Sequence, residues 1–481
     1  MDVMKLIFLI YQVTAILAVI HVVMDNRQPA KTVAWALIIY FVPIAGLVAY
    51  LFFGVNTRRE RMVEQRSLDQ LTRRSMLRFV EQRNLELPDG YKSLIDLFVN
   101  QNFSLPFNTN KVDFFTDGYQ FFCSLLHDIA KASHHIHIDI YIFEDDALGR
   151  LVADALIDRA RRGVEVRIVY DDVGCWSVKN GFFERMREAG IEVVPFLPVR
   201  FPQFTSKANY RNHRKLIVID GLTGYIGGMN IALRYVKGGK KRGMESNRWR
   251  DTMARIEGVG VYTLQRLFLI DWYFVDRTLL SDRKYYPAPL TQQGGTVGGS
   301  LMQAVSSGPA SPYPEIMQGY VQLILGARRY VYIETPYFIP TGVILFALKT
   351  AASKGVDVRL LVPRHGDTWL TQWASRSYLR EAAEAGVRVS LYEPGFLHSK
   401  MLVCDDAVST CGSTNIDFRS LENNFEANAF FYDEQVARRL REIFIADERE
   451  SVLLKALPHR MHPRFVVRLW ESLTRLFSPL L

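Results

Sequence analysis

The sequence contains two copies of one module, and this duplication limits the possible folds more than any other feature. Residues 161–172 read RRGVEVRIVYDD, and residues 353–364 read SKGVDVRLLVPR. EAGIEVVPF at 188–196 returns as EAGVRVSLY at 384–392. In each copy a helix-like segment ends at a glycine and a β-branched strand follows. This alternation predicts βαβ units, so we expect an α/β fold with two similar modules and a mainly parallel sheet.

A polar motif opens an apolar strand in each copy. NHRKLIVID (212–220) and FLHSKMLVCDD (396–406) share the spacing H-x-K-x4-D, and G-[GS]-x-N follows both. The matched residues are His213, Lys215, Asp220 and Asn230 in the first copy and His398, Lys400, Asp405 and Asn415 in the second. Because two such matches inside a repeat do not arise by chance, the motif is the candidate functional site.

The residue types of the motif favour a phosphate ligand. Residues i and i+2 of a strand point to the same face, so each histidine shares a face with its lysine. If the modules pack about a pseudo-two-fold axis, both pairs converge on one site. Two ammonium groups and two imidazoles suit a phosphodiester, whereas the ammonium groups would repel a cation. We therefore predict a phosphate site with no metal and no cofactor.

Two imidazoles at one phosphorus suggest a displacement in two steps. One imidazole attacks and forms a phosphohistidine, and the other protonates the leaving alkoxide and then deprotonates the incoming hydroxyl. We expect His213 to be the nucleophile. The lysines would stabilise charge on the non-bridging oxygens, and Asn230 and Asn415 would donate hydrogen bonds to them. Asp251 and Glu426, each following its own motif, are the candidates for the carboxylate that orients each imidazole.

Other polar residues near the motifs have structural explanations. Asp220 and Asp405 stand at strand ends before turns, so a role in holding the turn is favoured over direct chemistry, which stays open. The run HHIH (134–137) resembles a set of metal ligands. The second copy has GARRYVYI at the corresponding place, and we expect HHIH to be a solvent-facing strand start.

The N-terminal sequence predicts a transmembrane helical hairpin over residues 1–56. Residues 6–24 are nearly all apolar and residues 33–55 carry no charge, so each run can cross a hydrocarbon layer of roughly 30 Å as a helix. A basic linker region is expected over 57–109, and it begins with Arg58, Arg59, Arg61, Arg66, Arg73, Arg74 and Arg78. By the positive-inside rule, these arginines place the modules on the cytoplasmic side.

Composition suggests the remaining boundaries. We expect a first module over 110–285, a Gly- and Ser-rich linker over 286–312, a second module over 313–455 and an amphipathic tail over 456–481. For the tail, an interfacial helix and an ordinary docked helix both stay open. The basic loop 234–243 is either a site that gathers anionic head groups or a solvated loop.

The paired motifs resemble the phospholipase D superfamily, whose hallmark is two H-x-K-x4-D motifs with G-[GS]-x-N after each. The resemblance covers roughly residues 110–450 and implies two α/β/α sandwich modules that share one metal-independent active site. RQPAKTVAWALIIYFVPIAGLVAYLFFG (27–54), VSSGP (305–309), IETPYF (333–338) and SPLL (478–481) are similar to the bacterial cardiolipin synthases within it. That similarity implies transfer of a phosphatidyl group between two phosphatidylglycerols, giving cardiolipin and glycerol, at the bacterial cytoplasmic (inner) membrane.

The net charge of +9 suits an anionic partner, and we expect phosphatidylglycerol and other anionic phospholipids of the membrane. Nucleic acid is not expected, because a soluble nuclease needs no membrane hairpin. A phospholipase D-type hydrolase, or a transferase that uses phosphatidylethanolamine, remains an alternative. Two intact motifs disfavour an inactive lipid-binding scaffold, and the oligomeric state stays open. Near the first motif, Tyr210, Arg211, Trp249 and Arg250 suggest a lipid entry groove, and for the two aromatic residues packing in the core stays open.

Overall fold

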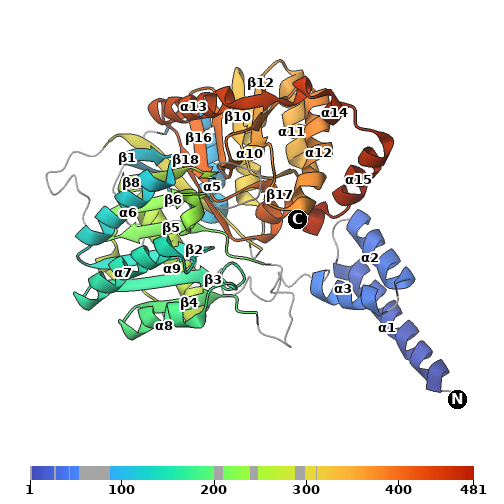
Figure 1. The fold of residues 1–481 in the computed structure, drawn as a ribbon, viewed down its shortest axis with the longest axis horizontal. Coiled ribbons are helices and arrows are strands. Elements are labelled where there is room, and N and C mark those ends of the chain that lie inside the picture. The colour runs from blue at the N-terminus through green and yellow to red at the C-terminus, as the bar shows by residue number, and fades with distance from the viewer. Residues whose placement is uncertain are drawn as a thin grey trace.

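The computed structural model describes residues 3–25, 29–42, 44–53, 87–199, 210–238, 248–287, 298–309 and 311–480. In this part of the chain the two modules join one sheet of 15 strands, in the order β19-β13-β12-β10-β15-β16-β18-β9-β1-β8-β6-β5-β2-β3-β4. Figure 1 shows the modules as two halves of one body, with helices on both faces of the sheet. The prediction of an α/β fold built from repeated modules is confirmed.

The strands of the two modules correspond one to one. The first has β2 (His135–Ile140), β3 (Glu165–Asp171), β4 (Glu192–Phe196), β5 (Lys215–Ile219), β6 (Thr223–Gly227) and β8 (Met253–Gly258). The second has β10 (Tyr330–Glu334), β12 (Asp357–Pro363), β13 (Arg388–Tyr392), β15 (Met401–Cys404), β16 (Val408–Gly412) and β18 (Glu426–Phe431). The short strand β19 (Ser451–Leu453) pairs with β13 at the sheet edge.

The prediction of a mainly parallel sheet is wrong. In the 15-stranded sheet of the described residues, only three strands of each module run parallel to one another, β2-β3-β4 and β10-β12-β13. The strands that carry the motifs, β5 and β15, pair antiparallel with both neighbours. The physical reason is the short turn after each motif strand, since a tight hairpin can join only antiparallel strands.

Helices cover both faces of each half-sheet. In the first module, α6 (Gly118–Lys131), α7 (Ala147–Arg161) and α8 (Asn180–Glu188) share a core on one face, and α9 (Val261–Asp276) covers the other. In the second module, α10 (Glu315–Gly326), α11 (Gly342–Ser353) and α12 (Trp369–Glu384) lie opposite α13 (Glu434–Arg449). Alternate residues of β5 explain the two layers. Ile217 and Ile219 enter one core, and Leu216 and Val218 enter the other.

Two segments expected to be linkers are structural. β9 (Ser300–Ser307), within the predicted linker 286–312, lies between β18 and β1 (Phe107–Phe115) at the junction of the modules. α5 (Lys92–Asn102), within the predicted linker 57–109, places Leu94, Ile95 and Phe98 in the core of the second module. The linker prediction is wrong for these two elements. In β9, small and polar residues conceal the burial of a central strand, and α5 is buried through its apolar face. Residues 57–86 lie outside the described residues.

The N-terminal region holds α1 (Val3–Asp25), α2 (Pro29–Phe41) and α3 (Ala45–Phe53). Among the described residues only one helix, over Met4–Met24, is long and apolar enough to cross a membrane. The predicted second span is instead two shorter helices, one ending at Phe41 and the other beginning at Ala45. The sequence between them contains a proline, which lacks the N–H that a continuous helix needs. The two-helix hairpin is therefore not confirmed.

Candidate active site

A short pairing between the modules fixes the position of His398. β7 (Trp249–Arg250) of the first module runs parallel to β14 (Phe396–Leu397) of the second. The His398 N–H donates to the Arg250 carbonyl at 2.7 Å. Because Asp251 is the next residue, His398 lies beside it, and its Nδ1–H donates to Asp251 Oδ2 at 2.5 Å.

A second pairing fixes His213 in the same way. A parallel bridge joins Asn212 to Phe425, and the His213 N–H donates to the Phe425 carbonyl at 2.9 Å. Glu426 follows Phe425, and His213 Nδ1–H lies 3.0 Å from its Oε1 and 3.1 Å from its Oε2. Both carboxylates are completely buried.

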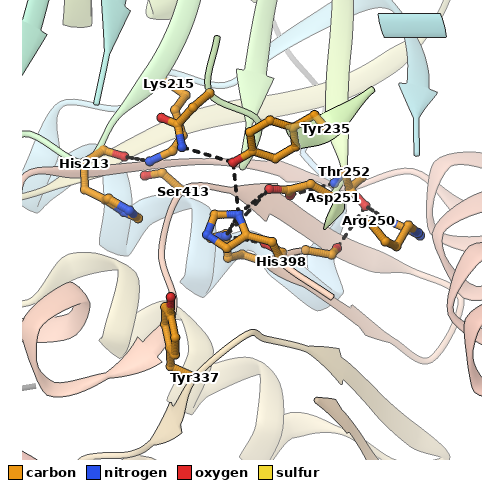
Figure 2. Close-up of polar contacts among 12 residues, drawn as sticks. His213, Lys215, Tyr235, Arg250, Asp251, Thr252, Tyr337, His398 and Ser413 are labelled. Carbon is orange, nitrogen blue, oxygen red and sulfur yellow. Dashed lines mark hydrogen bonds and ion pairs between the residues drawn. The ribbon is translucent and has the colours of Figure 1, made fainter. Parts of the chain in front are cut away.

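The carboxylates are thus crossed between the modules. Asp251 belongs to the first module and holds the histidine of the second, while Glu426 of the second holds the histidine of the first. The sequence identifies both acids, but the structure shows that each orients the imidazole of the other copy. Figure 2 shows His398 with Asp251, and His213 from a separate segment nearby. In each ring the hydrogen bond at Nδ1 leaves Nε2 for a substrate. Because each imidazole is held by a carboxylate of the other module, neither half is a complete site on its own.

The two motif lysines lie beside the imidazoles. Lys215 Nζ donates to the His213 carbonyl at 2.7 Å, and Lys400 Nζ donates to the His398 carbonyl. Lys400 Nζ also lies 2.8 Å from His398 Nδ1 and 3.8 Å from Asp251 Oδ2. Both lysines are buried, so their ammonium groups have lost most of their hydration and favour an anion.

Burial controls the protonation of the site. Burial, together with the charges of the nearby lysines, lowers the pKa of His213 to about 4 and that of His398 well below its usual value. Burial also lowers the pKa of Lys215 to about 7 and that of Lys400 to about 8. It raises the pKa of Asp251 to about 6, while the Lys400 charge opposes that rise. The histidines are therefore neutral near pH 7, the form that a nucleophile or base requires.

The residue that follows β6 is Gly228, and the matching residue after β16 is Ser413. They differ because the carboxylates that they contact, Asp251 and Glu426, differ in length. A Cβ at Gly228 would lie 2.1 Å from Asp251 Oδ1, so a glycine is required where this carboxylate meets the backbone. The matching residue of the second module is Ser413, whose hydroxyl donates to Glu426 Oε2. The longer glutamate leaves space for a side chain that helps to hold it.

Aromatic rings surround the imidazoles. The Tyr141 ring lies 4.8 Å from the His213 ring, and the Trp249 ring lies 4.8 Å from the His398 ring. The Tyr235 hydroxyl is 3.5 Å from His398 Nδ1, and Figure 2 shows Tyr337 reaching toward the same region from another segment. Sequence reasoning found Trp249 but missed the three tyrosines, because the repeat gives no signal at those positions.

The two asparagines lie near the site in different surroundings. The Asn230 side chain donates to the Tyr235 hydroxyl at 3.1 Å and accepts from the Ile142 N–H at 3.0 Å. Asn415 is buried, and its Oδ1 accepts no hydrogen bond among the described residues. The side chain of Asn230 therefore helps to position the Tyr235 ring. Direct hydrogen bonding of either asparagine to a substrate stays a prediction.

The structure does not bring Asp220 and Asp405 into the site. Asp220 accepts from the backbone N–H groups of residues 133–135 at 2.8–2.9 Å, and Asp405 accepts from those of residues 328–330 at 2.8–2.9 Å. Both residues have positive φ, 53° and 55°. The direct catalytic role that the shared motif left open for them does not fit this position, because each carboxylate ties the far end of its motif strand to the start of the neighbouring strand.

The prediction that HHIH is solvent-facing is also wrong. His135 and His137 are completely buried, because α9 covers this face of β2. Gln265 of α9 bonds both rings, at 2.9 Å to His135 Nε2 and 2.8 Å to His137 Nδ1. Within the described ranges, no three His, Cys, Asp or Glu side chains converge as a metal-binding group.

The predicted entry-groove arginines are interior. Arg211 Nη1 lies 3.5 Å from Asp171, and Arg250 pairs with Asp447. Arg250 lies in the β7–β14 pairing and Arg211 precedes the Asn212–Phe425 bridge, so both are beside the contacts that join the modules. Tyr210 packs against the core that includes Phe425, and Trp249 alone of the four faces an imidazole.

Comparison with known proteins agrees with the duplicated architecture. The family described as "Cardiolipin synthase, PLD-like domain" matches residues 125–247 and 320–448, one match in each module. The family described as "Phospholipase_D-nuclease N-terminal" matches residues 13–54.

Similar proteins cover nearly the whole chain. "Cardiolipin synthase" of Oceanobacillus iheyensis is 39% identical, over 97% of this chain and 96% of that protein. "Major cardiolipin synthase ClsA" of Bacillus subtilis is 36% identical, over 99% of each chain. The crystal structure of phosphatidylserine synthase from Haemophilus influenzae has a TM-score of 0.62 at 15% identity, over 81% of this chain and 100% of that one, and indicates a shared fold only.

Proposed function

The chain belongs to the cardiolipin synthase family, and from this premise we propose that it transfers a phosphatidyl group from one phosphatidylglycerol to a second, giving cardiolipin and glycerol. The observation that carries the proposal is the crossed pairing of the histidines with Glu426 and Asp251. It supplies two oriented imidazoles at one site, one for each partner in a double displacement.

In the first step, His213 Nε2 attacks the phosphorus of the donor lipid. A P–N bond forms and the P–O bond to the head-group glycerol breaks. His398, which takes up a proton at Nε2 when the anionic phosphodiester binds and Asp251 stabilises the imidazolium, delivers that proton to the leaving oxygen. The His213 side chain is the more accessible of the two, 11% against 6% exposed, which supports its role as nucleophile. Glu426 stabilises the positive charge that develops on the attacking ring.

In the second step, His398 takes the proton of a hydroxyl on the second phosphatidylglycerol. That oxygen attacks the phosphorus, a P–O bond forms and the P–N bond breaks, so His213 is released unchanged. Lys215 and Lys400 bind the non-bridging oxygens throughout. A bound phosphodiester also raises the pKa of both lysines, so they stay charged while the substrate is present.

We assign the modules to the cytoplasmic side of the bacterial inner membrane. The apolar helix over Met4–Met24 supports membrane attachment, and the arginines between 58 and 78 support this side. A multi-pass arrangement requires α2 and α3 to cross together, because each is too short to cross alone.

The test uses the full chain in phosphatidylglycerol vesicles with a chelator present, and it follows cardiolipin, glycerol and phosphatidic acid together. Cardiolipin and glycerol should rise in equal amounts. Phosphatidic acid without cardiolipin would mean that water is the acceptor and that the protein is a hydrolase. Cardiolipin that forms only after phosphatidylethanolamine is added would identify that lipid as the second substrate.

A further inference from the structure

The last long helix, α15 (Phe465–Arg475), turns its polar side toward the protein and its apolar side outward. It packs on α12 through the polar side. Glu471 is only 2% exposed, and its Oε2 accepts from Arg380 at 2.8 Å. Arg475 bonds Glu381 at 2.9 Å, and the Ser478 hydroxyl lies 3.1 Å from that of Tyr378. In a water-facing helix these polar groups would point outward.

The outward side of α15 and the turn after it is apolar. Its side chains are between 42% and 78% exposed: Phe465, Val466, Leu469, Trp470, Leu473, Leu476 and Phe477. Trp369, at the start of α12, is 57% exposed and extends this surface, with its ring 5.6 Å from that of Trp470. A contiguous apolar surface of this kind marks a contact with a partner or a membrane.

Charge identifies the occupant. Arg464 and Arg468 are exposed and lie on one flank of the apolar surface. A recess beside α12 is lined by three further arginines, Arg364, Arg376 and Arg460, of which Arg364 pairs with Glu393. Burial, together with the charges of Arg376 and Arg364, lowers the pKa of Arg460 to about 10. An apolar face with tryptophans and a cationic border suits the head-group boundary of an anionic bilayer.

The place of the helix agrees with this occupant. The chain already carries an apolar helix long enough to span a membrane, and Figure 1 shows α14 (Pro458–Met461) and α15 on the side of the molecule where α1, α2 and α3 lie. We propose that the apolar face of α15 and Trp369 insert into the surface of an anionic phospholipid bilayer, as a second membrane contact beyond the N-terminal helix. This contact would hold the catalytic modules against the surface that contains their substrate.

The direct test places an environment-sensitive label on the full chain in proteoliposomes. The exposed Cys123 is replaced by serine, and Leu473→Cys carries the label on the apolar face. Glu434→Cys, on α13, is the matched control at an exposed polar position. We expect brominated acyl chains to quench the label at 473 and not at 434, and more strongly when the vesicles contain phosphatidylglycerol than when they are phosphatidylcholine alone.

Two outcomes would overturn the proposal. A label at 473 that aqueous iodide quenches as fully as the label at 434 would mean that the face stays in water. Protection that persists in detergent and rises with protein concentration would mean that a second copy covers it. Neither result depends on the chemistry of the active site, so the proposed function would stand.

A kinetic test measures the consequence. Leu469→Glu with Leu473→Glu places two charges at positions that are 48% and 42% exposed and belong to no hydrophobic core cluster of the described residues, so the fold should be kept. We expect about tenfold slower turnover of vesicle phosphatidylglycerol and unchanged turnover of a short-chain soluble analogue. Equal rates on vesicles would contradict a role in docking. Leu469→Ala with Leu473→Ala is the milder control, with a smaller loss expected on vesicles.

Discussion

The two modules have the same architecture but make unequal halves of one site. Each supplies a histidine and a lysine on one strand, and each lends its carboxylate to the other module. The first pairs Gly228 with the short Asp251, and the second pairs Ser413 with the longer Glu426. The two modules therefore build one shared site whose halves differ in their carboxylates, and this difference matches the division into nucleophile and general acid.

The largest expected effect comes from removing either imidazole. His213→Ala and His398→Ala should each lower cardiolipin formation by about 10⁴-fold or more, because both steps need both rings. His127→Ala, at an exposed position on α6, should leave the rate unchanged. The measurement is initial rate in phosphatidylglycerol vesicles. A single-module site would instead retain most activity in one of the two variants.

The glycine–serine difference gives the next effect. Gly228→Ser forces an atom against the Asp251 carboxylate and should displace His398, which we expect to cost about 10²-fold in rate. Ser413→Gly removes one hydrogen bond to Glu426 and should cost only about fivefold to tenfold. Rates are compared at equal amounts of folded protein. Equal losses in both variants would remove the distinction between the halves.

The lysines predict a pH dependence that separates the modules. Only the ammonium form binds a phosphodiester, so kcat/KM should be high below the lysine pKa values and fall as pH rises through about 7 for Lys215 and about 8 for Lys400. Neutral His213 is required, and its pKa of about 4 predicts no acid limb from this residue until pH approaches 4. In Lys215→Met the residual activity should fall only above about pH 8. A rate that stays flat from pH 7 to pH 10 would contradict this assignment.

The two strand-end aspartates should have the smallest effect on rate. Asp220→Ala and Asp405→Ala each leave three backbone N–H groups without their acceptor and should lower the free energy of unfolding by about 2 kcal/mol. Thermal unfolding in detergent measures the loss. The folded fraction should keep its rate within about twofold, since neither carboxylate reaches the site. A rate loss comparable with that of the histidine variants would return these residues to the chemistry.

The repeat made much of this molecule predictable, because matching spacing implies matching structure. It located both His–Lys pairs, both candidate acids and the α/β modules. It did not reveal the crossing, since the bonded pairs are 213 and 147 residues apart and a repeat carries no information about contacts between its copies. It also concealed β9 and the burial of His135 and His137, because burial of a polar strand depends on the helix or strand that lies against it.

A burst experiment with a phosphatidyl ester of p-nitrophenol, whose leaving group needs no protonation, shows directly whether the carboxylates act across the modules. We expect a phosphatidyl adduct on His213, identified by peptide mapping. Asp251→Asn should keep the burst but stall turnover, and Glu426→Gln should slow the burst by about 10²-fold. An adduct on His213 that is lost in Asp251→Asn and kept in Glu426→Gln would contradict the crossed site. An adduct on His398 would reverse the roles of the two histidines.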